Sequence, residues 1–152
     1  MSRGRALHSC NSFIQLSTGN EYVIVAGGSY RVGCGSPQYE CKPPFSTSSV
    51  EIYNVKTMTW TDGPMLPHGI QSGVLVHGDG KTAAAYLIGG SGSERIIPPP
   101  QDPNQSRWNF PIYRSIYMLT ANLSRWIPYQ KNMITPRHGI VALTVPNVYL
   151  GC

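Results

Sequence analysis

The chain has 152 residues, the length of one ordinary domain, and only 12% of them are charged, against the roughly 25% usual in soluble domains. Its 16 glycines and 13 prolines, together with plentiful aromatic and β-branched residues, indicate a turn-rich all-β domain and exclude a disordered segment. The net charge of +5 is scattered singly along the chain, which argues against nucleic-acid binding, and no apolar stretch reaches membrane-spanning length, so no membrane association is expected.

The strands predicted for residues 1–65 follow from short apolar runs bounded by turn residues. The same four-strand pattern returns in residues 66–133 and begins again in residues 134–152. No segment has sustained helical periodicity, so almost no helix is expected. In chain order the predicted strands are 12–16, 22–26, 49–54 and 58–61, then 72–77, 84–88, 115–120 and 124–128, then 139–144 and 148–150.

The copies align through glycine pairs and tryptophans. In each full copy the second predicted strand ends in two glycines, and a tryptophan follows seven residues after a tyrosine or leucine. Paired glycines predict a close backbone approach or positive φ angles. Such self-similarity at a long period indicates a repeat architecture. The matching residues are Gly27, Gly28, Tyr53 and Trp60 in the first copy and Gly89, Gly90, Leu119 and Trp126 in the second.

These residues resemble the kelch repeat, an apolar run and a Gly-Gly doublet followed by a tyrosine and a tryptophan. The resemblance covers nearly the whole chain, with departures at Leu119, which replaces the tyrosine, and at Cys152, which replaces the second glycine of the partial copy. It implies four-stranded antiparallel blades of a β-propeller, which usually has about four to eight blades. We therefore expect an incomplete propeller that is part of a longer product. A small β-sandwich with fortuitous repeats is the alternative.

Two long connections are the candidate binding elements. Residues 29–48 and 91–114 both follow a glycine pair, so both should emerge on the same face of the propeller. Connections longer than about 12–15 residues are usually functional or disordered, and aromatic residues and arginine dominate binding hot spots. The candidate partner-binding residues are Tyr30, Arg31, Tyr39 and Phe45 in the first connection and Arg95, Arg107, Trp108 and Phe110 in the second.

The resemblance implies a protein-binding module that serves as a scaffold or adaptor, or as a substrate-recruiting arm of a ubiquitin ligase. The BTB or F-box domain that usually accompanies such an arm is not visible in the sequence. One alternative is an enzyme of galactose-oxidase type, but the Tyr, His and Cys ligands of its copper site do not map onto this chain. A second is a truncated fragment without independent function, which associates through open strand edges. We expect no catalytic residues, no cofactor and no metal.

Two patterns that invite a chemical interpretation are better explained structurally. Residues 78–82 are similar to a phosphate-binding loop, but that motif needs glycine at Leu75. A G-x-G-x-x-G/A motif ending at Ala83 needs a following helix, for which the five residues before Gly89 leave no room, so a hairpin turn is predicted instead. His8, His68 and His138 align as equivalent positions, one in each copy. We interpret them as structural residues or residues lining a central channel, in preference to a metal site.

The remaining alternatives concern the cysteines and the compartment. Cys34 and Cys41 share one connection, and free thiols are favoured over a local disulfide. This slightly favours a cytoplasmic location, although the compartment is open. The glycosylation sequons at Asn104 and Asn122 fall in predicted surface turns and matter only for a secreted protein.

Overall fold

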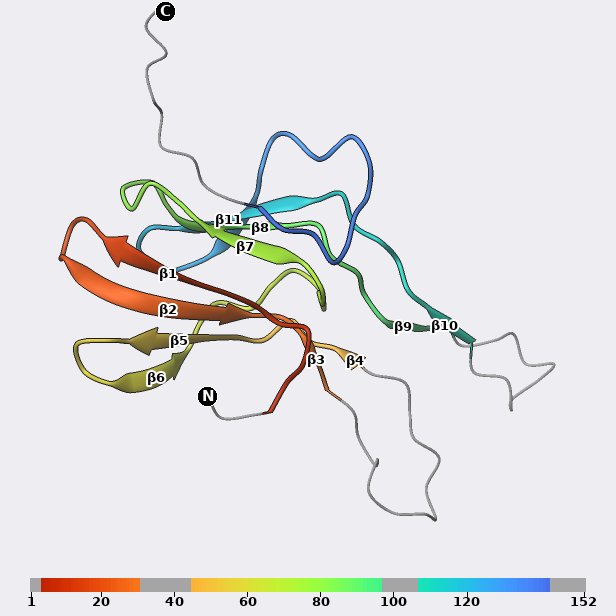
Figure 1. Cartoon of the computed structure of the whole chain (residues 1–152), viewed down its shortest axis with the longest axis horizontal. Coiled ribbons are helices and arrows are strands. Elements are labelled where there is room, and N and C mark those ends of the chain that lie inside the picture. Colours follow the sequence, from red (N-terminus) through yellow and green to blue (C-terminus); the bar gives the residue numbers. More distant parts are fainter. Residues whose placement is uncertain (1–3, 31–44, 97–106, 143–152) are drawn as a thin grey trace, which may run out of the picture.

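The computed structural model describes residues 4–30, 45–96 and 107–142. Within these ranges the regular structure is all β, and every paired strand is antiparallel, which confirms the prediction of an all-β fold of antiparallel sheets. Figure 1 shows two sheets lying one above the other, with two short ladders extending from the same end.

Each sheet is a meander of four strands, in which every strand pairs with the next one of that sheet. A two-stranded ladder is inserted between the second and third strands of each sheet. The first sheet contains β1 (Ser9–Gln15), β2 (Asn20–Ala26), β5 (Val50–Asn54) and β6 (Thr59–Asp62), with the ladder β3 (Ser29–Tyr30) and β4 (Phe45–Ser46). The second sheet contains β7 (Val74–His77), β8 (Ala83–Ile88), β11 (Ile116–Thr120) and β12 (Trp126–Pro128), with the ladder β9 (Glu94–Ile96) and β10 (Arg107–Asn109).

The strands expected in the two full copies are all present, within a few residues of their predicted bounds. The two ladders were not predicted, because their strands lie inside connections whose sequences lack an alternating pattern. Of the first strand predicted for the third copy, residues 139–142 are described and are not in a strand. Residues 143–152 lie outside the described residues.

Each glycine pair brings its sheet into backbone contact with the segment that follows that sheet. Gly27 and Gly28 have φ angles of 64° and 99°, and Gly89 and Gly90 repeat them at 62° and 99°. A Cβ on Gly27 would lie 2.2 Å from the carbonyl oxygen of Ile70. At Gly27 the two reasons predicted for paired glycines hold together, because the φ angle is positive and the close backbone leaves no room for a side chain. The Gly28 N–H uses this approach to donate to the Ile70 carbonyl at 2.7 Å.

The core lies mainly between the two sheets. β1 packs along β7 and β8, and polar side chains of β1 bridge to the backbone of the other sheet. Asn11 Nδ2 donates to the Leu75 carbonyl at 2.8 Å, and Gln15 Nε2 donates to the Ala121 carbonyl at 3.0 Å. The largest fully buried side chains are those of Ile24, Val50, Ile70, Leu87 and Leu119.

The two repeated tryptophans have different environments. Trp126 is 8% exposed, and its indole N–H donates to the Pro64 carbonyl of the first sheet at 3.0 Å. Trp60 is 40% exposed and packs on Tyr53 of its own sheet, with ring centroids 5.1 Å apart. Only the second tryptophan therefore has a neighbouring sheet in front of it within the part of the chain that the structure describes.

The segments that precede each first strand run side by side. Leu7, Ser72 and Gly139 occupy equivalent positions with φ angles of 56°, 54° and 62°. The Ser72 N–H donates to the Leu7 carbonyl at 2.9 Å, and the Gly139 N–H donates to the Ser72 carbonyl at 2.7 Å. The third copy thus begins with the same contact as the second.

This alignment corrects the interpretation of the three histidines, which was wrong in placing them at equivalent positions. His8 follows Leu7 directly, His68 precedes Ser72 by four residues, and His138 precedes Gly139 by one. The two segments have equal lengths here, because Leu66 and Met133 donate to the equivalent carbonyls of Ser48 and Arg114 and each lies six residues before Ser72 or Gly139. The histidines share a residue type but not a position.

The glycine turns give a stability prediction. Gly27→Ala should lower the free energy of unfolding by about 1–3 kcal/mol or more, because it adds a positive-φ penalty and a contact with Ile70. Gly19→Ala is the matched control, since Gly19 has φ of 70° with nothing within 4 Å of an added Cβ. Urea denaturation measures both, and equal losses would show that the close approach to Ile70 costs nothing.

Candidate functional site

Arg5 holds together the two ends of the first long connection, residues 29–48. Arg5 Nη1 donates to the carbonyl of Gly27, two residues before the connection, at 3.1 Å, and to the carbonyl of Ser49, the residue after it, at 3.0 Å. Arg5 Nη2 also pairs with Glu51 Oε2 at 2.6 Å, and the two side chains are 3% and 4% exposed. The buried guanidinium therefore ties the N-terminal segment to both ends of the connection.

The ladder at the start of this connection carries two aromatic rings. Tyr30 pairs with Phe45 across β3 and β4, and their ring centroids are 6.2 Å apart. Tyr30 is exposed and Phe45 is half-buried. Cross-strand aromatic pairs stabilise short ladders, so the two rings hold each other at the surface.

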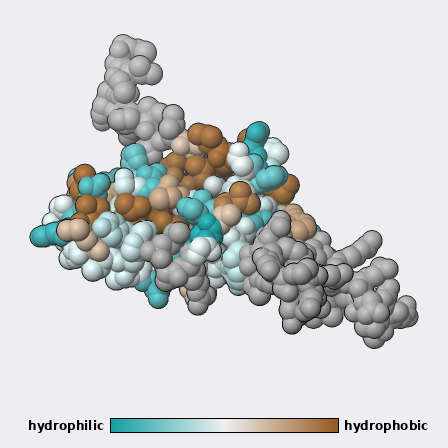
Figure 2. Space-filling view, turned by 60° about the horizontal axis from the view of Figure 1, so that its bottom comes forward, coloured by the Kyte–Doolittle hydropathy of each residue, from teal (hydrophilic) through white to brown (hydrophobic). Residues whose placement is uncertain are grey.

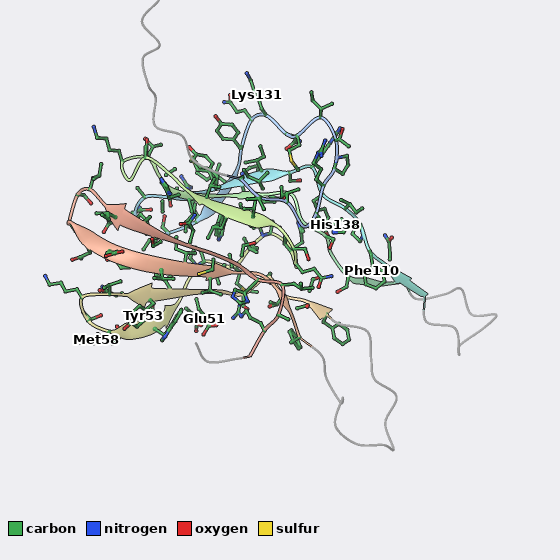
Figure 3. The ribbon with its side chains drawn as sticks, viewed as in Figure 1. Glu51, Tyr53, Met58, Phe110, Lys131 and His138 are labelled. Carbon is green, nitrogen blue, oxygen red and sulfur yellow. The ribbon has the colours of Figure 1, made fainter. Side chains whose placement is uncertain are left out.

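The second ladder presents apolar side chains at its base. Asn109 pairs with Glu94, and Ile112 bridges Ser91, so the chain stays extended on both sides of Phe110. Phe110 and Ile112 are both about half exposed. Phe110 lies beside the β9–β10 ladder in Figure 3, at the far end of the molecule from Met58.

Hydrogen bonds between serines join the two ladders. The backbone N–H of Ser46, in β4, donates to Ser93 Oγ at 2.6 Å. Ser93 Oγ also donates to Ser46 Oγ at 3.1 Å. The two connections therefore contact each other at their bases. We call four residues on or beside the two ladders the ladder surface, namely Tyr30, Phe45, Phe110 and Ile112.

The ladder surface rests on a packed layer. The His68 ring lies 4.4 Å from the ring of Tyr113 and 5.7 Å from that of Tyr117, measured between centroids. A Cβ on Gly69 would lie 2.4 Å from the Ser46 carbonyl oxygen. The segment that joins the two sheets is therefore wedged between the two ladders and supports both.

The sequence-predicted binding residues divide into three groups. Tyr30 and Phe45 face each other across the first ladder, and Phe110 follows the second ladder directly. Arg95, Arg107 and Trp108 lie in β9 and β10, with Arg95 opposite Trp108, and the structure describes their backbone alone. Arg31 and Tyr39 lie outside the described residues.

Sequence reasoning missed Arg5, Ser46, Ser93 and Ile112. The serines and Arg5 act through contacts with residues more than 20 positions away, which no local pattern signals. Ile112 could have been found, because it is a large apolar residue inside a long connection next to a proline.

Among the described residues no metal site is assembled. No three His, Cys, Asp or Glu side chains among them are grouped closely enough to bind a metal ion. Residues 78–82 form a hairpin turn, in which Asp79 Oδ1 accepts from the N–H groups of Lys81, Thr82 and Ala83 at 2.8–3.0 Å. The turn thus takes the form expected from the sequence.

The modifiable residues are only partly described. Cys10 carries an exposed free thiol, whereas Cys34, Cys41 and Cys152 lie outside the described residues, as does Asn104. Asn122 is exposed in the β11–β12 turn, where its Oδ1 accepts from the hydroxyls of Thr120 and Ser124 at 2.8 and 2.7 Å.

Comparisons with known proteins found no relative. No protein-family model matches the chain, and no curated protein is significantly similar to it in sequence. Across the described ranges there is also no helix of the length and apolarity needed to cross a membrane.

The Arg5 clamp gives a prediction. Arg5→Met should destabilise the protein by about 3–5 kcal/mol, because it leaves the Glu51 carboxylate buried without this partner. Hydrogen exchange of the Gly27 amide, which donates to Ser49, should accelerate as the base of the connection loosens. Arg125→Met, at an exposed arginine, is the control and should change stability by less than about 0.5 kcal/mol. Equal effects of the two substitutions would contradict the clamp.

The Asp79 turn predicts a pH dependence. Hydrogen bonds from Ala83 and its neighbours hold the pKa of Asp79 below its ordinary value of 3.8. A lowered folded-state pKa contributes stability that is complete above the unfolded value and is lost as the pH falls through the folded value. Asp79→Asn should therefore cost about 0.5 kcal/mol near neutral pH, since the group is solvent-exposed, and the difference from wild type should shrink below about pH 4.

Urea denaturation near neutral pH and at about pH 3 measures this difference. Asp62→Asn, which changes an exposed carboxylate on β6, is the control. A wild-type advantage that persists unchanged at the lower pH would refute the prediction for Asp79.

Proposed function

We propose that this protein is a protein-binding module built from successive blades of an incomplete kelch-type β-propeller, and that it binds its partner through the ladder surface. It would act as a scaffold or adaptor rather than as an enzyme. The blade assignment is supported by the repeated motif together with contacts that repeat in three dimensions.

The repeated contacts concern both the turns and the junctions. The two glycine pairs have nearly identical φ angles, and the second glycine of each pair donates to a carbonyl of the following segment, that of Ile70 or Arg137. The first glycine of each pair donates to the serine that ends the long connection, Ser49 or Ser115, at 3.0 Å. Such repetition is expected of blades that follow one another around an axis.

The chemistry of the ladder surface suits a protein partner. Its exposed aromatic rings and Ile112 supply apolar area, and aromatic side chains lose little conformational entropy on binding. The layer of His68 and Tyr113 beneath holds the two ladders in place. A surface that is already ordered binds with a smaller entropic cost.

One observation carries the proposal, namely the hydrogen bonds between Ser46 and Ser93. Without them the two connections would be separate loops with separate small apolar patches. With them, the two connections are joined at their bases, which supports the inference that one partner contacts both.

The test is affinity capture with the tagged full chain, using Tyr30→Ala, Phe110→Ala and Ile112→Ala. Each substitution should weaken capture of the same partner by at least about fivefold, the loss expected at a binding hot spot. Met58→Ala is the matched control, because Met58 is 76% exposed at the opposite end of the first sheet (Figure 3). The proposal fails if the variants retain every protein that the control captures, or if variants in the two ladders lose different proteins.

A further inference from the structure

Each sheet has one face turned toward the other sheet and one face turned away. Cross-strand partners share a face, so the pairings assign the side chains. In the first sheet, Ile24 pairs with Ile52 on the inner face, while Val23, Tyr53 and Trp60 pair in a row on the outer face. Figure 2 shows that apolar side chains reach the surface in patches on the side in view.

In the second sheet the roles of the two faces are exchanged. Leu119 pairs with Ala85 and Trp126 on the face turned toward the first sheet. Met118 pairs with Tyr86 and Ile127 on the face turned away. By the repeat, the face that each sheet turns toward the other corresponds to the face that the other sheet turns away.

The first half of this correspondence is seen on the outer face of the first sheet. Val23 and Tyr53 are half-buried and Trp60 is 40% exposed. Their counterparts in the second sheet, which the first sheet covers, are no more than 8% exposed. These counterparts are Ala85, Leu119 and Trp126.

The second half is seen on the outer face of the second sheet. Tyr86, Ile116 and Met118 are all half-buried there. Their counterparts in the first sheet, which the second sheet covers, are no more than 5% exposed. These counterparts are Ile24, Val50 and Ile52.

We propose that a second copy of this chain packs the outer face of its second sheet onto the outer face of the first sheet, repeating between molecules the contact already made within one. Among the described residues, the two faces turned away carry the counterparts of the two halves of that internal interface, so their apolar positions correspond. This inference rests on the repeated sheet contacts and is independent of the ladder surface.

The repeat also assigns the hydrogen bond that would anchor Trp60. Within the chain, Trp126 donates to the carbonyl of Pro64, which follows Gly63. Gly63 and Tyr129 are equivalent, because their N–H groups donate to the equivalent carbonyls of Val50 and Ile116. Trp60 would therefore donate to the Gln130 carbonyl of the second copy.

The outer face of the first sheet carries Arg5, Glu51 and Asp62, of which Asp62, opposite Glu51 on β6, is exposed. Arg5 and Glu51 pair with each other there at 2.6 Å. Since each already neutralises the other and both are nearly buried, covering them with a second copy desolvates little further charge.

This contact joins the outer face of a second sheet to the outer face of a first sheet. Any pair of molecules therefore still has one outer face of each sheet available for a further copy. A head-to-tail contact of this kind produces a closed ring or an open filament. It differs from the association through strand edges expected from the sequence, which would use the unpaired backbone of β6 or β12 rather than the side chains of either face.

The test is sedimentation velocity of the full chain over a series of concentrations. Wild type should assemble as its concentration rises, and Trp60→Glu and Met118→Glu should each weaken assembly at least about tenfold, because each buries a charge in one face. Thr59→Glu is the matched control, since Thr59 is exposed on the same strand and points to the opposite face. The control should assemble like wild type.

Mixing the two variants makes the test specific. Trp60→Glu retains an intact second-sheet face and Met118→Glu retains an intact first-sheet face, so an equimolar mixture should form dimers that do not grow further. Circular dichroism checks folding, and Ile127→Glu replaces Met118→Glu if the latter is unfolded. The proposal is overturned if wild type stays monomeric throughout, if the mixture stays monomeric, or if Thr59→Glu dissociates the assembly as strongly as Trp60→Glu.

Discussion

The hydrogen bond from the second glycine of each pair to the segment that follows its sheet is the constraint on which the rest of the structure depends. The donation from Gly28 to Ile70 at 2.7 Å requires two backbones to approach more closely than any side chain would permit. It places the start of the second sheet against the end of β2, and this sets the separation at which Ile24 and Leu87 are both buried. The same bond at Gly90 places residues 137–139 against the second sheet.

The sheets could be predicted from the sequence because their signals are local. Apolar runs that end in paired glycines, and turns such as 78–80, mark strand ends with little dependence on the rest of the chain. The ladders could not be predicted, because β3 and β4 are two residues long and are held by contacts such as that between Ser46 and Ser93. The alignment of His68 with His8 failed for a related reason, since backbone hydrogen bonds and not residue type define equivalent positions.

The sequence predicted which residue types occur at the candidate site but not the contacts that hold them in place. The aromatic residues of the long connections indicated a binding surface, and Tyr30, Phe45 and Phe110 lie on or beside the two short ladders. The base that organises them is made by Arg5 and by the His68 segment, which come from other parts of the chain. Contacts at such sequence separations follow from the way the two sheets pack, and that packing is visible only in three dimensions.

The position of the ladders has an evolutionary consequence. In each sheet the long connection is closed at its base by a short antiparallel pair, and in the first sheet Arg5 closes it a second time just below. Residues inserted or deleted between β3 and β4, or between β9 and β10, are thereby separated from the glycine turns and from the core. The tips of the two connections are free to diverge in length and sequence between descendants of this chain, while the framework that presents them is inherited unchanged.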